Sequence, residues 1–295
     1  TFPGGKGLNK SIAVANAGAI IYHAGCIGND AQILTDVLLK SGVDISYLKK
    51  ADVKNGHAII QVNAQGENSI FLYPGSNQMI TDEFIDRVLS DFGKGDIILL
   101  QNEISGIKHI VDKAYEREMI IVLNPSPMNE KLLEIDLNKI SYIILNEVEG
   151  EAISQKSEPG KILSYFKAKY PNVKVMLTLG SKGCIYMDSN EEIYQPIFET
   201  AVVDTTAAGD TFTGYFIAGI ASGREYRDIL KTASCAAAIA VSKKGAAPSI
   251  PMYNEVQKAL KSMKEKKDKS DIVYQKIVCY LEENLSTATL SELAE

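Results

Sequence analysis

Short apolar runs alternate along the chain with longer segments in which apolar residues recur at helical spacing. The runs are continuous rather than alternating, as expected for parallel strands that are covered on both faces. They lie at residues 20–24, 96–101, 119–123, 141–145 and 173–179, and the helical segments lie at 32–40, 81–91, 106–117 and 161–170. The pattern predicts an α/β fold, with a doubly wound sheet flanked by helices and ligands beyond the carboxyl ends of the strands.

Residues 56–73 depart from this pattern. They contain two β-rich runs joined by the sequence NAQG at 63–66, which is typical of a β-hairpin. Such an insertion can be ordinary edge structure, or it can be a small β lid over a binding site.

The composition argues against two classes of protein. The formal net charge of −6 argues against a polyanion as the main partner, because nucleic-acid affinity depends on basic surface. No apolar run approaches the roughly 18 residues that cross a membrane. The four cysteines are scattered without a C-x-x-C pair, and the three histidines are isolated. We therefore expect a cytoplasmic protein with reduced thiols and no zinc site.

The opening stretch, TFPGGKGLNKS, is close to a phosphate-binding P-loop. It fails the motif because Asn9 stands where the second glycine is required, before Lys10 and Ser11. A phosphate-binding role for this segment is favoured only when no other part of the chain is better suited to bind phosphate.

Residues 202–223, VVDTTAAGDTFTGYFIAGIASG, are better suited to bind a phosphate. The small residues Ala207, Ala208 and Gly209 precede a predicted helix, whose exposed N–H groups and dipole favour an anion. Asp210 can accept a proton from a hydroxyl nucleophile, or it can merely cap the helix. Asp204 and the run of small residues favour the functional interpretation.

Two signatures make the chain resemble the ribokinase family of sugar kinases. DTTAAGDTF at 204–212 matches the family pattern D-T-x-A-A-G-D-T-F, and GGKGLN at 4–9 matches G-G-K-G-x-N. Further agreements follow in order: LLQNE at 99–103, LNEVE at 145–149, TLGSKG at 178–183 and AAIAVSKKGAAPSIP at 237–251. The resemblance covers about residues 3–264. It implies ATP-dependent phosphorylation of a pentose, with D-ribose at its 5-hydroxyl as the expected substrate.

The resemblance also implies roles for residues on the sugar side of the site. Asp210 is the expected catalytic base, and Ala207, Ala208 and Gly209 are the expected anion hole. Together with Asp210, the expected sugar contacts are Gly5, Lys6, Asn9 and Glu103, with Ala58, Ile60 and Leu72 of the hairpin packing on the pentose as a lid. The glycine segment is thus expected to bind the sugar.

ATP, Mg²⁺ and K⁺ are the cofactors that the resemblance implies. The expected nucleotide contacts are Asn146, Thr178, Gly180, Ser181, Gly183, Gly209 and Ser234, of which Ser234 stands where relatives have His or Asn. Asn146 and Glu149 form the N-x-x-E element expected to organise Mg²⁺. The expected K⁺ site comprises Asp204, Thr206, Ala240, Lys243, Gly245 and Ser249, mostly through backbone carbonyls.

The two ends of the chain depart from the family pattern. The family's first strand and its Asn-x-Asp sugar contacts should precede Gly4, and they are absent from the sequence. We expect a kinase domain over 1–264 and a lysine-rich linker with a helical tail over 265–295. The tail resembles the start of an AraC-type helix-turn-helix.

The resemblance leaves partners and substrate partly open. The expected partners are the sugar, ATP and a second copy of the chain bound through the lid. Nucleic acid is expected only through a complete C-terminal domain. Deoxyribose or another furanose is the alternative kinase substrate. From a different class, the chain could be a sugar-sensing transcriptional regulator with a kinase-like receptor domain.

Overall fold

The computed structural model describes residues 2–62 and 68–266 of the chain. In this part the largest sheet has six strands in the order β10–β9–β8–β7–β6–β5. Strands β5 to β8 are parallel, and β9 and β10 are antiparallel additions at one edge. The bounds are β5 (Ile97–Gln101), β6 (Ile120–Asn124), β7 (Tyr142–Asn146), β8 (Lys174–Thr178), β9 (Cys184–Met187) and β10 (Glu192–Gln195). The predicted α/β sheet is therefore confirmed, as a mixed sheet.

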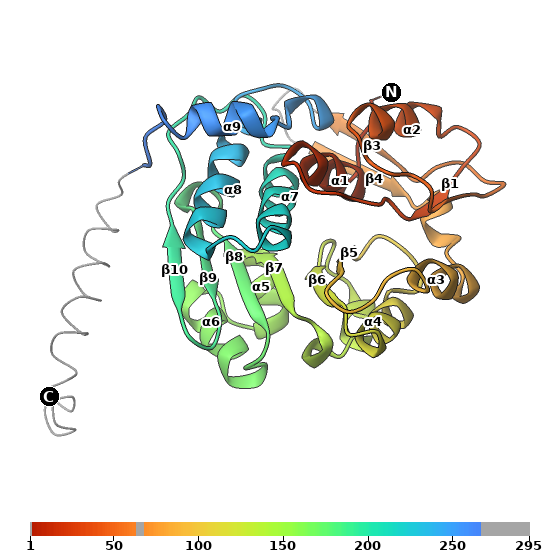
Figure 1. Ribbon diagram of the computed structural model, residues 1–295, viewed down its shortest axis with the longest axis horizontal. Helices are drawn as coiled ribbons and strands as arrows, with labels where there is room; N and C mark the ends of the chain where they lie inside the picture. Colours follow the sequence, from red (N-terminus) through yellow and green to blue (C-terminus); the bar gives the residue numbers. More distant parts are fainter. Residues whose placement is uncertain (1, 63–67, 267–295) are drawn as a thin grey trace, which may run out of the picture.

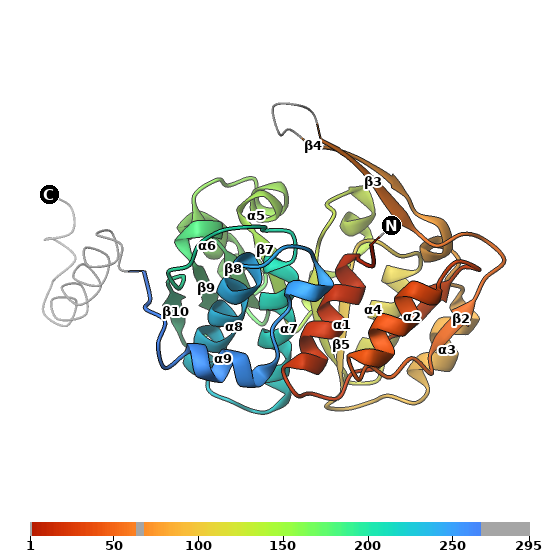
Figure 2. The ribbon, with the colours of Figure 1, turned by 90° about the horizontal axis from the view of Figure 1, so that it is seen from above.

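Helices cover both faces of this sheet (Figures 1 and 2). One layer contains α1 (Lys6–Asn16), α7 (Ala208–Ala221), α8 (Tyr226–Val241) and α9 (Tyr253–Ala259); the other contains α3 (Asp82–Leu89), α4 (Ile107–Glu116), α5 (Glu147–Ser154) and α6 (Pro159–Lys169). Successive strand residues point to opposite layers. Ile144 and Met176 pack with α7 and α8, whereas Ile143 and Val175 pack with α6. Burial on both faces explains why these strands are continuously apolar.

The N-terminal part adds α2 (Gln32–Lys40) and a separate parallel pair of strands, β1 (Gly25–Ile27) and β2 (Leu48–Lys50). The strand predicted at 20–24 is wrong. In that segment Tyr22 makes a single bridge to Asp44, and the chain becomes a strand only at Gly25. The apolar run misled the prediction because Ile20 is 88% exposed and is not part of a covered sheet.

Gly214 allows α7 to cross α1 at close range. A Cβ at this position would clash with the Cβ of Ala13 and lie 2.9 Å from the backbone nitrogen of Val14. The absence of a side chain at Gly214 thus permits the close approach of α1 and α7, whose first turns each contain part of one signature segment.

The predicted hairpin is confirmed as β3 (His57–Val62) and β4 (Asn68–Tyr73), and its turn at 63–66 lies outside the described residues. Ala58 pairs with Leu72, so these two of the three residues expected to contact the pentose share one face. In the same ladder Ile60 pairs with Ile70. Figure 2 shows the hairpin projecting away from the body of the protein. Leu72 is accordingly 66% exposed.

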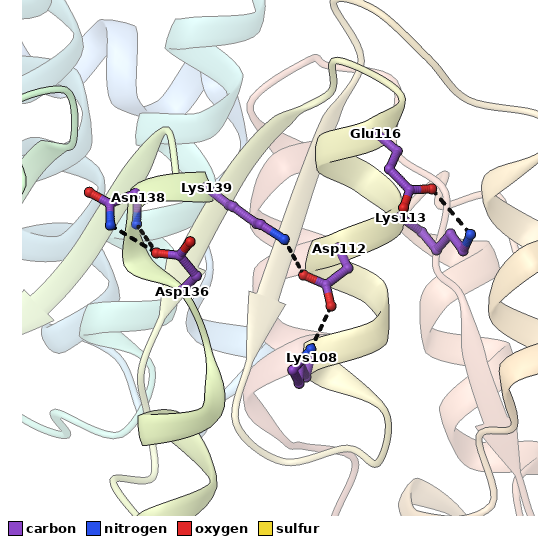
Figure 3. A network of polar contacts seen from close by, with 7 residues as sticks. All are labelled: Lys108, Asp112, Lys113, Glu116, Asp136, Asn138 and Lys139. Carbon is purple, nitrogen blue, oxygen red and sulfur yellow. Dashed lines mark hydrogen bonds and ion pairs between the residues drawn. The ribbon is translucent and has the colours of Figure 1, made fainter.

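A polar network joins α4 to the segment before β7 (Figure 3). Asp112 accepts from Lys108 over 2.7 Å and from Lys139 over 2.6 Å, and these bonds lower the pKa of its carboxyl group. Lys139 precedes the start of β7, so the network lies toward the amino ends of the strands. Partly exposed pairs of this kind contribute little to stability. None of the helices in the described ranges has both the length and the apolar character of a membrane span.

Candidate active site

Four parallel strands end in polar residues at one edge of the sheet. Gln101 of β5 is in register with Asn124 of β6, and Asn146 of β7 is in register with Thr178 of β8. Because carboxyl ends of parallel strands meet at the same edge, these side chains form a polar row where α/β sheets bind ligands.

Four of the expected sugar residues form two contacting pairs near this row, whereas the hairpin with Ala58, Ile60 and Leu72 lies apart from them (Figure 2). Nδ2 of Asn9 donates to Oδ2 of Asp210 over 2.9 Å, and Nζ of Lys6 lies 3.6 Å from Oε1 of Glu103. Gly5 precedes α1 with a φ of 110°, a conformation that favours glycine. The opening segment is therefore the N-terminus of a helix rather than a loop.

Asn9 retains an unused polar atom. Its side chain is 3% exposed, and Oδ1 has no hydrogen-bond partner among the described residues. Buried polar atoms are nearly always satisfied, so this oxygen is suited to accept a hydrogen bond from a ligand hydroxyl.

Asp210 lies in the first turn of α7 and does not cap it. The N-cap is Ala207, without a side-chain cap. The Asp210 side chain is 12% exposed, and burial raises the pKa of its carboxyl group. Lys10, Asn9 and Lys6 oppose this shift. A buried carboxylate with a raised pKa is a stronger base than a solvated one, which suits proton abstraction.

The start of α7 has room for an anion. Ala208 N donates to Thr205 O and Thr211 N donates to Ala207 O, whereas the N–H groups of Gly209 and Asp210 lie in the first helical turn, where no intrahelical acceptor precedes them. A Cβ added at Gly209 would meet no heavy atom within 4 Å. Open space beside a helix N-terminus is the geometry that an anion hole requires.

Asn146 and Glu149 form a capping box at the start of α5. Glu149 N donates to Oδ1 of Asn146 over 2.8 Å, and Asn146 N donates to Oε2 of Glu149 over 3.1 Å. Asn124 also approaches Oε2 of Glu149, at 3.5 Å. These residues thus have a local structural role that is sufficient to explain their spacing.

The same donor set is compatible with Mg²⁺. Within 2–62 and 68–266 no cluster of three or more His, Cys, Asp or Glu side chains could hold a metal. Mg²⁺ keeps several waters and commonly takes one or two carboxylates beside substrate phosphates, so Glu149 with neighbouring amides fits it.

Apart from Asn146 and Gly209, the expected nucleotide residues lie at the end of β8, directly after it, or on α8. Gly180 and Gly183 both have positive φ, and a Cβ at Gly183 would clash with the backbone carbonyl of Gln195. Thr178 Oγ1 donates to Leu145 O over 3.3 Å, and Ser181 is exposed. Ser234 is 7% exposed, with its hydroxyl 4.0 Å from the sulfur of Cys184.

Three of the residues expected to bind K⁺ contact one another. Asp204 accepts hydrogen bonds through Oδ1 from Thr206 and through Oδ2 from Gly245 N, the latter over 2.9 Å. The bond from the Thr206 hydroxyl, followed by those from the two backbone N–H groups, lowers the pKa of the Asp204 carboxyl group. Lys243 N donates to Ala240 O, and the Ser249 hydroxyl donates to Ala246 O over 2.8 Å. The hydrogen bond between Gly245 and Asp204 thus links the segment after α8 to the loop that precedes α7.

Sequence reasoning missed two residues of this site. Asn124 binds both Lys10 and the carbonyl of Ile144, and its position directly after a buried run could have revealed it. Lys10 is 2% exposed and lies 3.7 Å from Asp210, which no sequence pattern indicated.

Comparison with known proteins agrees with this geometry. Residues 1–252 match the family described as pfkB family carbohydrate kinase. The chain is 32% identical over 265 residues to the ribokinase of Bacillus subtilis (strain 168), covering 88% of each protein. It is 29% identical over 271 residues to the deoxyribokinase of Salmonella typhi, covering 85% of this chain and 86% of that protein. The structure of Arabidopsis thaliana ribokinase complexed with ribose and ATP matches with a TM-score of 0.77 and 29% identity, over 88% of this chain and 87% of that one. The chain therefore belongs to the pfkB family of carbohydrate kinases.

Proposed function

We propose that this protein is a ribokinase, which transfers the γ-phosphoryl group of ATP to the 5-hydroxyl of D-ribose. The observation that carries the proposal is the contact between Asn9 and Asp210, which joins the two signature segments at one point. The similarity to the ribokinases of Bacillus subtilis and Arabidopsis thaliana supports the choice of sugar.

In the proposed reaction Asp210 accepts the proton of the 5-hydroxyl as its oxygen bonds to the γ-phosphorus. The bond from that phosphorus to the bridging oxygen breaks, and its electrons leave with ADP. N–H groups at the start of α7 stabilise charge on the transferring group. Glu149 and Asn146 would hold Mg²⁺, which would supply positive charge to the phosphate oxygens of ATP. Lys6, Glu103 and the free Oδ1 of Asn9 hold the sugar hydroxyls.

We also propose that K⁺ binds near Asp204 and shapes the start of α7. The bonds from Thr206 and Gly245 to Asp204 fix the segment immediately before the proposed anion hole. Backbone carbonyls next to this carboxylate would be suitable ligands for a monovalent cation.

We propose that the hairpin is both a lid and a dimer interface. Ala58 and Leu72 occupy one face, whereas Ile59 and Phe71 occupy the other. Ile59 and Phe71 are 55% and 57% exposed, an unusual exposure for large apolar side chains on neighbouring strands. Light scattering should give the mass of a dimer for the wild type and of a monomer for Phe71→Lys. A monomeric wild type would contradict this proposal.

We propose a cytoplasmic location for the protein. Cys26, Cys184 and Cys235 are free thiols and all are buried, as expected for a protein in a reducing compartment.

The competing sugar is deoxyribose, because a deoxyribokinase is related at 29% identity. A coupled assay of ADP release should be run with ribose, 2-deoxyribose, arabinose and fructose at equal concentrations. The proposal predicts the highest kcat/KM for ribose. A higher value for 2-deoxyribose would reassign the substrate, and no turnover with any sugar would contradict a kinase function.

A further inference from the structure

Lys10 is a buried cation to which neither the signature segments nor the proposed mechanism gives a role. Its side chain extends from α1 and is 2% exposed. Nζ donates to Oδ1 of Asn124 over 2.5 Å and lies 3.7 Å from Oδ1 of Asp210. Burial of an ammonium group is costly unless it is paired, so a lysine at this position calls for a specific reason.

The two oxygens of Asp210 have different partners. Oδ2 accepts from Asn9, and Oδ1 faces Lys10. Asn9 and Lys10 are consecutive residues of α1, so one helical turn holds the carboxylate from both sides. Asn124 fixes the ammonium group in turn, through the carboxyl end of β6.

The charges around this pair favour its ionised form. Glu103 and Glu149 attract Lys10, whereas Lys6 repels it. Burial lowers the pKa of Lys10 to about 8 against the attraction of Asp210, which leaves the side chain mainly protonated at neutral pH. Burial raises the pKa of Asp210, and Lys10 is the largest opposing influence.

We propose that Lys10 is a positioning residue that holds Asp210 as an oriented carboxylate, ready to accept the proton of the substrate hydroxyl. This inference rests on the proposed function of Asp210 as the base. Lys10 keeps its own proton through the reaction and acts through the charge and direction of Asp210. A desolvated carboxylate without this partner would take up a proton at a higher pH and lose its capacity as a base.

The direct test is to follow the carboxyl ¹³C signal of Asp210 with pH, assigned by its loss in Asp210→Asn. Lys10→Met and Lys10→Gln remove the charge at similar side-chain length, and Gln retains a donor for Asn124. An opposite charge at this range lowers a carboxyl pKa by about 1–3 units. Both variants should therefore raise the pKa of Asp210 by that amount. The acid limb of the kcat–pH profile should shift to higher pH by the same amount.

Lys139→Met is the matched control, since it removes a lysine from a different carboxylate, Asp112 (Figure 3). It should leave the Asp210 signal and the acid limb of kcat unchanged. An Asp210 pKa that stays unchanged in folded Lys10→Met or Lys10→Gln would overturn the proposal. A kcat loss that is uniform across pH would also overturn it.

The wild type provides a second measurement that does not depend on any Lys10 variant folding. The Asp210 signal should show a smaller inflection at the pH where Lys10 loses its proton, a pKa that burial of the ammonium group lowers. Absence of such an inflection over the whole range in which Lys10 is deprotonated would contradict the proposal. These NMR results do not depend on turnover. A wild type that is inactive on sugars would count against the proposed function, whereas the NMR titration alone decides whether Lys10 and Asp210 are coupled.

Discussion

The side-chain amide of Asn9, in the first helix, donates a 2.9 Å hydrogen bond to the carboxylate of Asp210, which lies 201 positions later. This contact exists because α1 and α7 cross closely at Gly214 and begin at the same edge of the sheet. The glycine segment at the start of the chain and the small-residue segment before α7 thus form one site. In the proposed function the first segment supplies polar contacts, and the second supplies the base and the anion hole.

Replacement of Asp210 by Asn should abolish most turnover. The amide keeps the size of the side chain but cannot accept the hydroxyl proton, and general bases contribute about 10²–10⁴-fold. We expect kcat to fall by that factor, with ATP affinity nearly unchanged in calorimetry. Asp112→Asn, which alters a carboxylate of the network in Figure 3, should keep wild-type turnover. Near-normal kcat in Asp210→Asn would exclude Asp210 as the base.

The central sheet could be predicted from sequence because a strand that is buried on both faces is a continuous apolar run. The runs at 96–101, 119–123, 141–145 and 173–179 correspond to β5 to β8, within one residue at each end. The run at 20–24 failed because an apolar sequence does not reveal whether another layer covers it. The antiparallel strands β9 and β10 were not predicted, since each has only four residues.

The site could be predicted only in part. Residues in the signature segments were identified through resemblance, and their side chains do converge, as Asn9 and Asp210 demonstrate. Lys10 could not be assigned, because its burial depends on helix packing that no local pattern encodes. At Asn146 and Glu149 a capping box accounts for the N-x-x-E spacing on structural grounds, so spacing alone does not distinguish a helix cap from a magnesium site.

Gly214→Ala should destabilise the protein. Its Cβ would collide with Ala13 of α1, and overpacking in a core costs about 1–3 kcal/mol. Gly160→Ala in α6 is the control, because no heavy atom lies within 4 Å of its added Cβ. It should be neutral or more stable by about 0.5–1 kcal/mol. Urea unfolding measures both, and equal stability of the two variants would contradict the close crossing of α1 and α7.

His23 should make the protein sensitive to acid. Its ring nitrogen lies 2.7 Å from the Ser11 hydroxyl, and burial lowers its pKa to about 4. The unfolded chain, with a histidine pKa of about 6.5, binds the proton first as pH falls. Stability should therefore decrease from about pH 6.5 down to about pH 4, by up to about 1.4 kcal/mol per pH unit.

The test of this effect compares wild type with His23→Gln in urea unfolding at pH 7.5 and pH 5. The wild type should lose more stability between the two values, because Gln cannot take up a proton. Equal losses would show that His23 is not held neutral in the folded protein.

Potassium should increase activity if the cation binds near Asp204. We expect a higher kcat in KCl than in NaCl or tetramethylammonium chloride at equal ionic strength. Asp204→Asn should reduce this difference, because it removes the anionic group that holds Thr206 and Gly245. Equal rates in all three salts would contradict the proposed K⁺ site.

The protein should phosphorylate ribose at the 5-hydroxyl, with Asp210 as the base. The most direct measurement is NMR of the product formed from ¹³C-labelled ribose and ATP, with wild type and Asp210→Asn compared under the same conditions. We predict that wild type gives a product whose C5 signal is split by phosphorus, and that Asp210→Asn gives almost none in the same time. Coupling at C1 or another carbon, or no phosphorylated ribose from the wild type, would contradict the account.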